Sequence, residues 1–175
     1  MIINLKIIVL IIIIEMDPKS FTKTSFCNVT VDNITENTSK QYILNQMNIL
    51  CDGISYKHRY AKIYNDMFKK NLNNPHLLCL KSIGNPYLLF ITQINSLNYA
   101  FLIDKKVKEG YQYPKIFILP YHFKSDVYKN HSLFECELIR TKSNTWKISI
   151  GDVYFLNGKN MKTKIIIDRM NDIHQ

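Results

Sequence analysis

The feature that most constrains this chain is a long apolar run in its middle, Leu77–Thr92. The part from Tyr87 to Ile94 is rich in β-prone residues, and a short turn-rich segment separates it from a second apolar run, Tyr99–Ile103. Two β-prone runs joined by a short turn predict an antiparallel hairpin. We therefore expect this hairpin to lie within a β-rich body.

Further strands are expected on the C-terminal side of this hairpin, because short β-prone runs alternate there with turn residues. The second and third of them flank a polar tetrapeptide and predict another hairpin. The expected strands are Lys115–Leu119, Ser132–Arg140, Trp146–Ile150 and Val153–Leu156; the turn Asn157-Gly158 follows, and Ile165–Ile173 is expected to begin a helix.

Two helices are predicted before the β-rich part. The first has Ser39 as a suitable N-cap, carries Ile43 and Met47 four positions apart, and ends at Cys51-Asp52-Gly53. The second is an amphipathic stretch, Tyr60–Lys70. Helices followed by antiparallel strands indicate an α+β fold class, here an antiparallel β-rich domain preceded by two helices.

The chain is expected to divide into an apolar leader (1–15), a flexible polar arm without periodicity (16–40) and a single α+β domain (41–175). The leader is shorter than the roughly 20 residues that span a bilayer, and no small-residue cleavage site follows it. Three interpretations are open: a signal anchor, a buried strand, or an upstream extension of the reading frame. We favour the last, with Met16 as the first residue, and expect no stable membrane association.

The net charge is +9 and the pI about 9.3. Such a charge favours anionic partners, for example nucleic acid, nucleotides or a membrane surface. The cysteines, Cys27, Cys51, Cys79 and Cys136, include no pair with the two-residue spacing of a zinc ribbon, so we expect free thiols. The ligands of any metal ion stay undefined by the sequence.

Lys81 lies inside the central apolar run, three residues before Gly84. A lysine in such a place has two interpretations. In the first it marks the edge of a strand, with its stem packed and its ammonium group at the surface. In the second it is partly desolvated and acts as a nucleophile. Taken alone, this stretch favours the first interpretation, because lysine is seldom buried.

Three short patterns follow one another in the β-rich part: Lys81-Ser82-Ile83-Gly84 before an apolar strand, Ser132–Leu138 with Glu137 near its end, and Asp152–Gly158, followed by Arg169-Met170. In order and spacing they resemble the covalent nucleotidyltransferase superfamily. This superfamily contains the mRNA-capping guanylyltransferases and the ATP-dependent DNA and RNA ligases. The resemblance covers roughly residues 77–173 and is greatest to the capping-enzyme branch of large DNA viruses.

The resemblance implies a nucleotidyltransferase-like fold and a defined chemistry. Lys81 would attack the α-phosphate of GTP or ATP and form a lysyl-nucleotide, while Mg²⁺ neutralises charge on the phosphates. Gly84, Glu137, Asp152 and Arg169 would bind the nucleotide. The implied partner is an acceptor RNA or DNA, and the implied location is the virus factory in the cytoplasm of the infected host cell, or the virion.

Several positions differ from the family pattern. Ile83 stands where the first motif has an acidic residue, and Pro86 where an arginine is expected. Gly151 replaces an aromatic residue, and Cys136 replaces a glycine. The later motifs, including a lysine-rich strand that would hold the triphosphate, have no counterpart before Gln175. We therefore expect a shortened, degenerate domain, or one that depends on a second subunit.

Two functions of other classes stay open. One is a non-catalytic module that binds nucleic acid through its basic surface. The other is a virion or scaffold protein that keeps only the fold.

Overall fold

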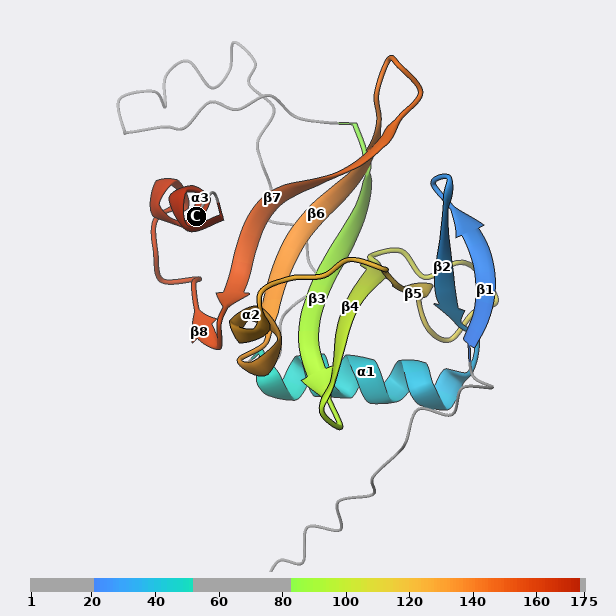
Figure 1. The fold of residues 1–175 in the computed structure, drawn as a ribbon, viewed down its shortest axis with the longest axis horizontal. Coiled ribbons are helices and arrows are strands. Elements are labelled where there is room, and N and C mark those ends of the chain that lie inside the picture. Colours follow the sequence, from blue (N-terminus) through green and yellow to red (C-terminus); the bar gives the residue numbers. More distant parts are fainter. Residues whose placement is uncertain (1–20, 52–82, 174–175) are drawn as a thin grey trace, which may run out of the picture.

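The computed structural model describes residues 21–51 and 83–173. These residues form an α+β fold built on an eight-stranded antiparallel sheet with the order β1-β2-β5-β4-β3-β6-β7-β8 (Figure 1). The strands are β1 (Phe21–Phe26), β2 (Val29–Ile34), β3 (Asn85–Ile94), β4 (Leu97–Asp104), β5 (Ile116–Ile118), β6 (Ser132–Arg140), β7 (Trp146–Leu156) and β8 (Lys159–Asn160); the helices are α1 (Asn37–Leu50), α2 (Ser125–Lys129) and α3 (Ile166–Ile173).

Strand β3 is the centre of the sheet, because it pairs with β4 along one edge and with β6 along the other. The predicted hairpin is confirmed: β3 turns into β4 at Asn95 and Ser96, both of which have positive φ angles (49° and 65°). Strand β6 has the predicted bounds, and β7 runs unbroken through the two strands that were predicted for its residues.

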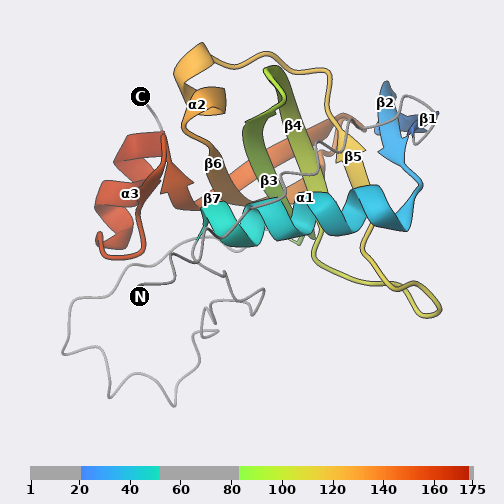
Figure 2. The same ribbon diagram turned by 90° about the horizontal axis from the view of Figure 1, so that it is seen from below.

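The sheet is covered on both faces at β3, which explains why Tyr87–Ile91 is a continuous apolar run. Leu88 and Phe90 belong to the core on the side of α1, whereas Leu89 and Ile91 belong to the core on the opposite side. Helix α1 crosses behind the sheet in Figure 1, and Figure 2 shows it along one side of the sheet. The helix contributes Ile43 and Met47 to the core, and its C-cap residue Cys51 is buried with them.

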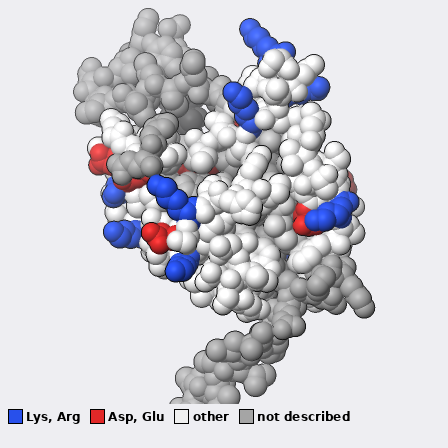
Figure 3. Space-filling model, viewed as in Figure 1, with Lys and Arg blue, Asp and Glu red and all other residues white. Residues whose placement is uncertain are grey.

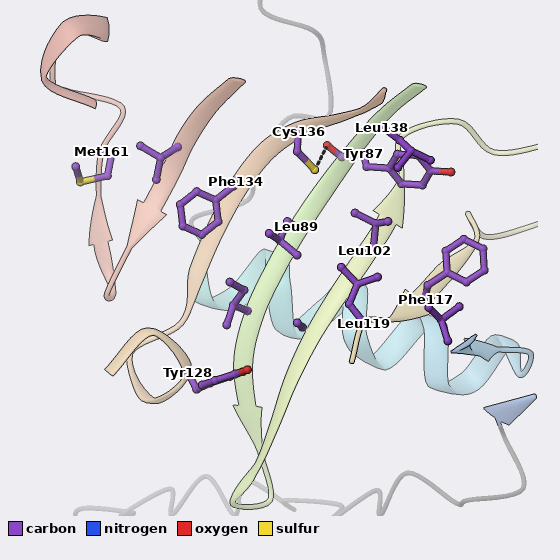
Figure 4. Close-up of a cluster of buried hydrophobic side chains, with 14 residues drawn as sticks. Tyr87, Leu89, Leu102, Phe117, Leu119, Tyr128, Phe134, Cys136, Leu138 and Met161 are labelled. Carbon is purple, nitrogen blue, oxygen red and sulfur yellow. Dashed lines mark hydrogen bonds between the residues drawn. The ribbon is translucent and has the colours of Figure 1, made fainter. Parts of the chain in front are cut away.

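The opposite face carries its own core, drawn in Figure 4. Leu89, Leu102 and Phe134 come from neighbouring strands in the middle of the sheet, and Tyr128 comes from α2 at one end. The Tyr128 hydroxyl donates a hydrogen bond to the backbone carbonyl of Tyr121 (3.0 Å). This bond ties the segment before α2 to the helix and so holds it over the sheet.

The expectation of a flexible arm over 16–40 is wrong for its described part, which forms the β1–β2 hairpin and the start of α1. The strands turn at Cys27 and Asn28, which have φ angles of 54° and 66°. Few of the hairpin's side chains are buried, and the two that are, Val31 and Ile34, belong to different cores. The segment therefore lacks a regular apolar alternation, although its threonines favour a strand.

The helices agree with the sequence in part. Helix α1 begins at Asn37, with Glu36 as the N-cap residue instead of Ser39, and ends before Cys51 as predicted. The helix predicted over Ile165–Ile173 is confirmed as α3, and α2 was not predicted. In the ranges that the structure describes, no helix is long and apolar enough to cross a bilayer. The predicted leader and the helix at Tyr60–Lys70 lie outside those ranges.

Packing of α1 against the sheet predicts a large difference between two neighbouring positions. Met47 is fully buried, whereas Ile49 is 73% exposed on the same helix. Met47→Ala is expected to lower the free energy of unfolding by about 2–5 kcal/mol, because it leaves a cavity under the sheet. Ile49→Ala, the matched control, is expected to change it by less than about 0.5 kcal/mol. Urea unfolding followed by circular dichroism measures both, and equal losses would show that α1 does not pack as described.

Candidate functional site

Two of the predicted site residues meet where β3 begins. The backbone N–H of Gly84 donates a hydrogen bond to Oε2 of Glu137 on β6 (3.2 Å), across 53 residues of sequence. The next residues of the two strands are in register, with Pro86 opposite Glu137. The glycine of the first pattern and the glutamate of the second are therefore neighbours.

Gly84 is required at this position because space is short. A Cβ atom at this residue would lie 2.8 Å from Cβ of Glu137 and 2.9 Å from the carbonyl oxygen of Leu138. Real Cβ atoms do not approach other atoms so closely, so any larger residue would force the two strands apart. The preceding residue, Ile83, has a fully exposed side chain.

A β-bulge in β7 orients the third predicted residue. Cys136 is opposite Ile150 and Glu135 is opposite Asp152, so Gly151 is an extra residue in β7. A bulge shifts the alternation of side chains and so re-aims the residues beyond it. Glu135 and Asp152 are cross-strand neighbours and share one face, and Glu137, two residues along β6, lies on that face too. We call Glu135, Glu137 and Asp152 the carboxylate face.

Glu135 is engaged inside the protein. Its Oε1 accepts a hydrogen bond from Nζ of Lys105 at 2.7 Å, and its Oε2 accepts one from the hydroxyl of Tyr154. The Lys105 side chain is only 2% exposed, although it carries a charge. The backbone N–H of Lys105 also donates to the carbonyl oxygen of Pro86 (3.2 Å). This network connects the carboxylate face to the first residues of β3.

Asp152 and Arg169 form a buried ion pair. Nε and Nη2 of Arg169 donate to the two carboxylate oxygens of Asp152 at 2.8 and 3.2 Å. Nη1 of Arg169 donates to the carbonyl oxygen of Lys164, just before α3. The pair therefore attaches α3 to β7. Asp152 itself lies within β7.

The residue in place of the expected glycine, Cys136, points away from the carboxylate face into the core drawn in Figure 4. Burial raises the pKa of its thiol to about 12 and that of the Tyr87 hydroxyl to about 12. Neither group is therefore charged near neutral pH. Cys27 and Cys136 are free thiols, as predicted.

The structure brings the predicted site residues together as two pairs, Gly84–Glu137 and Asp152–Arg169, on neighbouring strands. Lys81 lies outside the described residues. Sequence reasoning missed Lys105 and Tyr154, which hold the carboxylate face together. The sequence signal for Lys105 was the charged segment Asp104-Lys105-Lys106, which follows the apolar run of β4.

The comparisons with known proteins add no relative: no protein-family model matches the sequence, and no curated protein matches it significantly.

The Asp152–Arg169 pair predicts a large effect of removing one partner. Arg169→Leu is expected to cost about 3–5 kcal/mol of stability, because it leaves a buried carboxylate without its charge partner. The control is Lys23→Ala, which breaks the exposed Lys23–Asp32 pair (2.7 Å) and is expected to cost at most about 1 kcal/mol. Chemical denaturation measures both losses. Equal small losses would contradict the attachment of α3 through this pair.

A pH dependence is predicted at His131, which lies between α2 and β6 with a φ angle of 44°. Its Nε2 atom is buried and, within the described part of the chain, has no hydrogen-bond partner. Burial lowers the pKa of this imidazole below its ordinary value of 6.5, and a backbone hydrogen bond at Leu50 opposes the effect only in part.

Between the folded-state pKa of His131 and 6.5, the unfolded chain binds more protons than the folded one. Stability is therefore expected to be complete above pH 6.5 and to fall as the pH drops below that value. His131→Gln removes this contribution, while the same substitution at exposed His122 serves as the control. Unfolding curves from pH 5 to 8 test the prediction, and an unchanged slope in His131→Gln would refute it.

Proposed function

We propose that this chain is a degenerate nucleotidyltransferase domain of the capping-enzyme and ligase type, with its nucleotide site where β3 begins and β6 passes. One observation carries the proposal. Gly84 and Glu137, which belong to two different motifs of the resemblance, contact each other through a hydrogen bond of 3.2 Å. In a chance resemblance, nothing would require these two residues to be neighbours.

Lys81 is the proposed nucleophile, and in the sequence it is three residues before Gly84. Its neutral amine would attack the α-phosphorus of GTP or ATP. A nitrogen–phosphorus bond forms, the bond between the α-phosphorus and the bridging oxygen breaks, and pyrophosphate leaves. The proton lost by the amine passes to solvent. The product is a nucleotide joined to the protein through a phosphoramidate.

Glu137 is the described residue best suited to the nucleotide itself. The Gly84 hydrogen bond fixes one carboxylate oxygen at the start of β3, where it can accept a hydrogen bond from a ribose hydroxyl. Mg²⁺ is commonly held by one or two carboxylates together with substrate phosphates, and it neutralises charge on those phosphates. Glu137 fits one such ligand, although no group of three or more potential ligands occurs among the residues that the structure describes.

Asp152 and Arg169 are proposed to have a structural role, because their ion pair attaches α3 to β7. They are not proposed to contact the phosphates. Their side chains are each 9% exposed and are directed at one another. Glu135 is proposed to have a similar structural role through its contact with Lys105. Among the described residues, only the Gly84–Glu137 pair and its immediate surroundings are therefore proposed to contact the nucleotide.

The proposal is tested by incubating the full chain with α-labelled GTP or ATP and Mg²⁺, followed by denaturing electrophoresis. If the degenerate domain keeps the first step of the reaction without a second subunit, label stays on the wild-type protein and is lost in Lys81→Ala. Glu137→Gln is expected to lower the yield about tenfold or more, the range for a damaged metal site. Gly84→Ala is expected to lower it as well, because the added Cβ displaces the glutamate.

Exposed Lys142 on the β6–β7 turn provides the control, since Lys142→Ala should label as the wild type does. Label that survives Lys81→Ala would contradict the proposed nucleophile. A wild-type chain that is folded by circular dichroism but takes up no label would contradict the enzyme and favour a binding module or a scaffold.

A further inference from the structure

A groove opens beside the candidate site, on the side of the first residues of β3 that faces β4 and not β6. Its volume is about 440 Å³, and it lies between the β1–β2 hairpin and the segment that joins β4 to β5. We call it the lysine groove. It is lined by Thr24, Ser25, Phe26, Asn33, Asn85, Pro86, Tyr87, Asp104, Lys106, Lys108, Lys115 and Phe117.

The charge of the lining is strongly positive. Lys106, Lys108 and Lys115 face a single carboxylate, Asp104, whose Oδ1 already accepts the backbone N–H of Lys106 (2.8 Å). Across residues 21–51 and 83–173, none of the three ammonium groups forms an ion pair, whereas Lys105 does. The groove therefore gathers cations that the described fold does not use.

A fourth lysine adds to this charge. Lys40 of α1 is 7% exposed, and its pKa is lowered by burial and then by the positive charge of Lys115. Two like charges thus repel each other beside the groove. An anion bound near Lys115 in the groove would reduce that repulsion.

The loop that borders the groove carries an exposed aromatic ring. Tyr111 is 64% exposed and lies between Lys108 and Lys115 in the sequence. Figure 2 shows this loop projecting from the α1 side of the sheet. On the opposite face, seen in Figure 3, the Lys and Arg side chains lie at the margins, several of them beside acidic side chains. Tyr111 does not line the groove, because the groove opens on the face of Phe26, Tyr87 and Phe117 and the loop projects from the α1 side.

We propose that the lysine groove binds single-stranded nucleic acid, with Lys106, Lys108 and Lys115 on the phosphates. A basic groove with aromatic side chains is the common arrangement for binding single strands without sequence preference. The volume suits one or two nucleotides at a time and not a double helix. Side chains such as Asn33 and Thr24 add hydrogen-bond donors for phosphate and sugar oxygens.

This inference goes beyond the proposed nucleotide site, because it needs no chemistry at Lys81. The two sites nevertheless adjoin, since Asn85 and Pro86 line the groove and follow Gly84 directly. A strand held in the groove would therefore lead toward the proposed nucleotide site.

The test measures binding of a fluorescein-labelled single-stranded 12-mer, as RNA and as DNA, to the full chain by fluorescence anisotropy over a range of salt concentrations. The groove variant is Lys106→Ala/Lys108→Ala/Lys115→Ala. The matched control is Lys142→Ala/Lys159→Ala/Lys162→Ala, which removes the same charge from exposed lysines elsewhere.

The groove variant is expected to bind at least about tenfold more weakly and to reduce the slope of log K against log salt by about 2, since each phosphate contact on a single strand contributes about 0.7. The control is expected to keep the wild-type slope.

Equal losses in the groove variant and the control would overturn the proposal, because binding would then follow net charge alone. Displacement of the 12-mer by an equal concentration of GTP or inorganic triphosphate would also overturn it and indicate a site for free phosphates. Lys81→Ala is expected to bind the 12-mer as the wild type does. A chain that fails to take up label can therefore still confirm the groove.

Discussion

The structure depends on one strand being enclosed on all sides. Strand β3 is hydrogen-bonded along both edges and packed on both faces, so that most of its side chains are buried. Each large apolar side chain buried in this way contributes about 1.5–3 kcal/mol relative to an exposed one. Because β3 cannot shift without breaking two ladders and two cores, its first residues are fixed as well. The contact between Gly84 and Glu137 follows from that rigidity.

The central strands could be predicted from the sequence because their signal is local. Tyr87–Ile91 is apolar without interruption, as expected of a strand with two covered faces. The β1–β2 hairpin could not be predicted in the same way. Its strand character depends on pairing with β5, and Asn33 and Asp32 take part in that pairing as polar residues. A polar strand leaves no apolar pattern to detect.

The residues of the candidate site differ in the same way: some could be predicted from the local sequence and others could not. Gly84 and Glu137 were predicted from their motifs, and the space around Gly84 explains why no other residue is suited to that position. The burial of Lys105 could not be predicted, because it results from a partner on β6 that lies 30 residues further along the chain. The same holds for Asp152 and Arg169, whose bidentate pairing requires the Gly151 bulge and the docking of α3.

The distribution of charge shows how a basic chain can carry an acidic site. Two carboxylates of the carboxylate face, Glu135 and Asp152, are neutralised by Lys105 and Arg169 inside the fold. The surplus of positive charge therefore lies elsewhere, and the lysine groove concentrates part of it on the other side of the first residues of β3 from Glu137. A phosphate-bearing ligand would be attracted by the groove and repelled by this glutamate at close range. Such a ligand could extend past the start of β3 only if a cation shielded the two negative groups from each other.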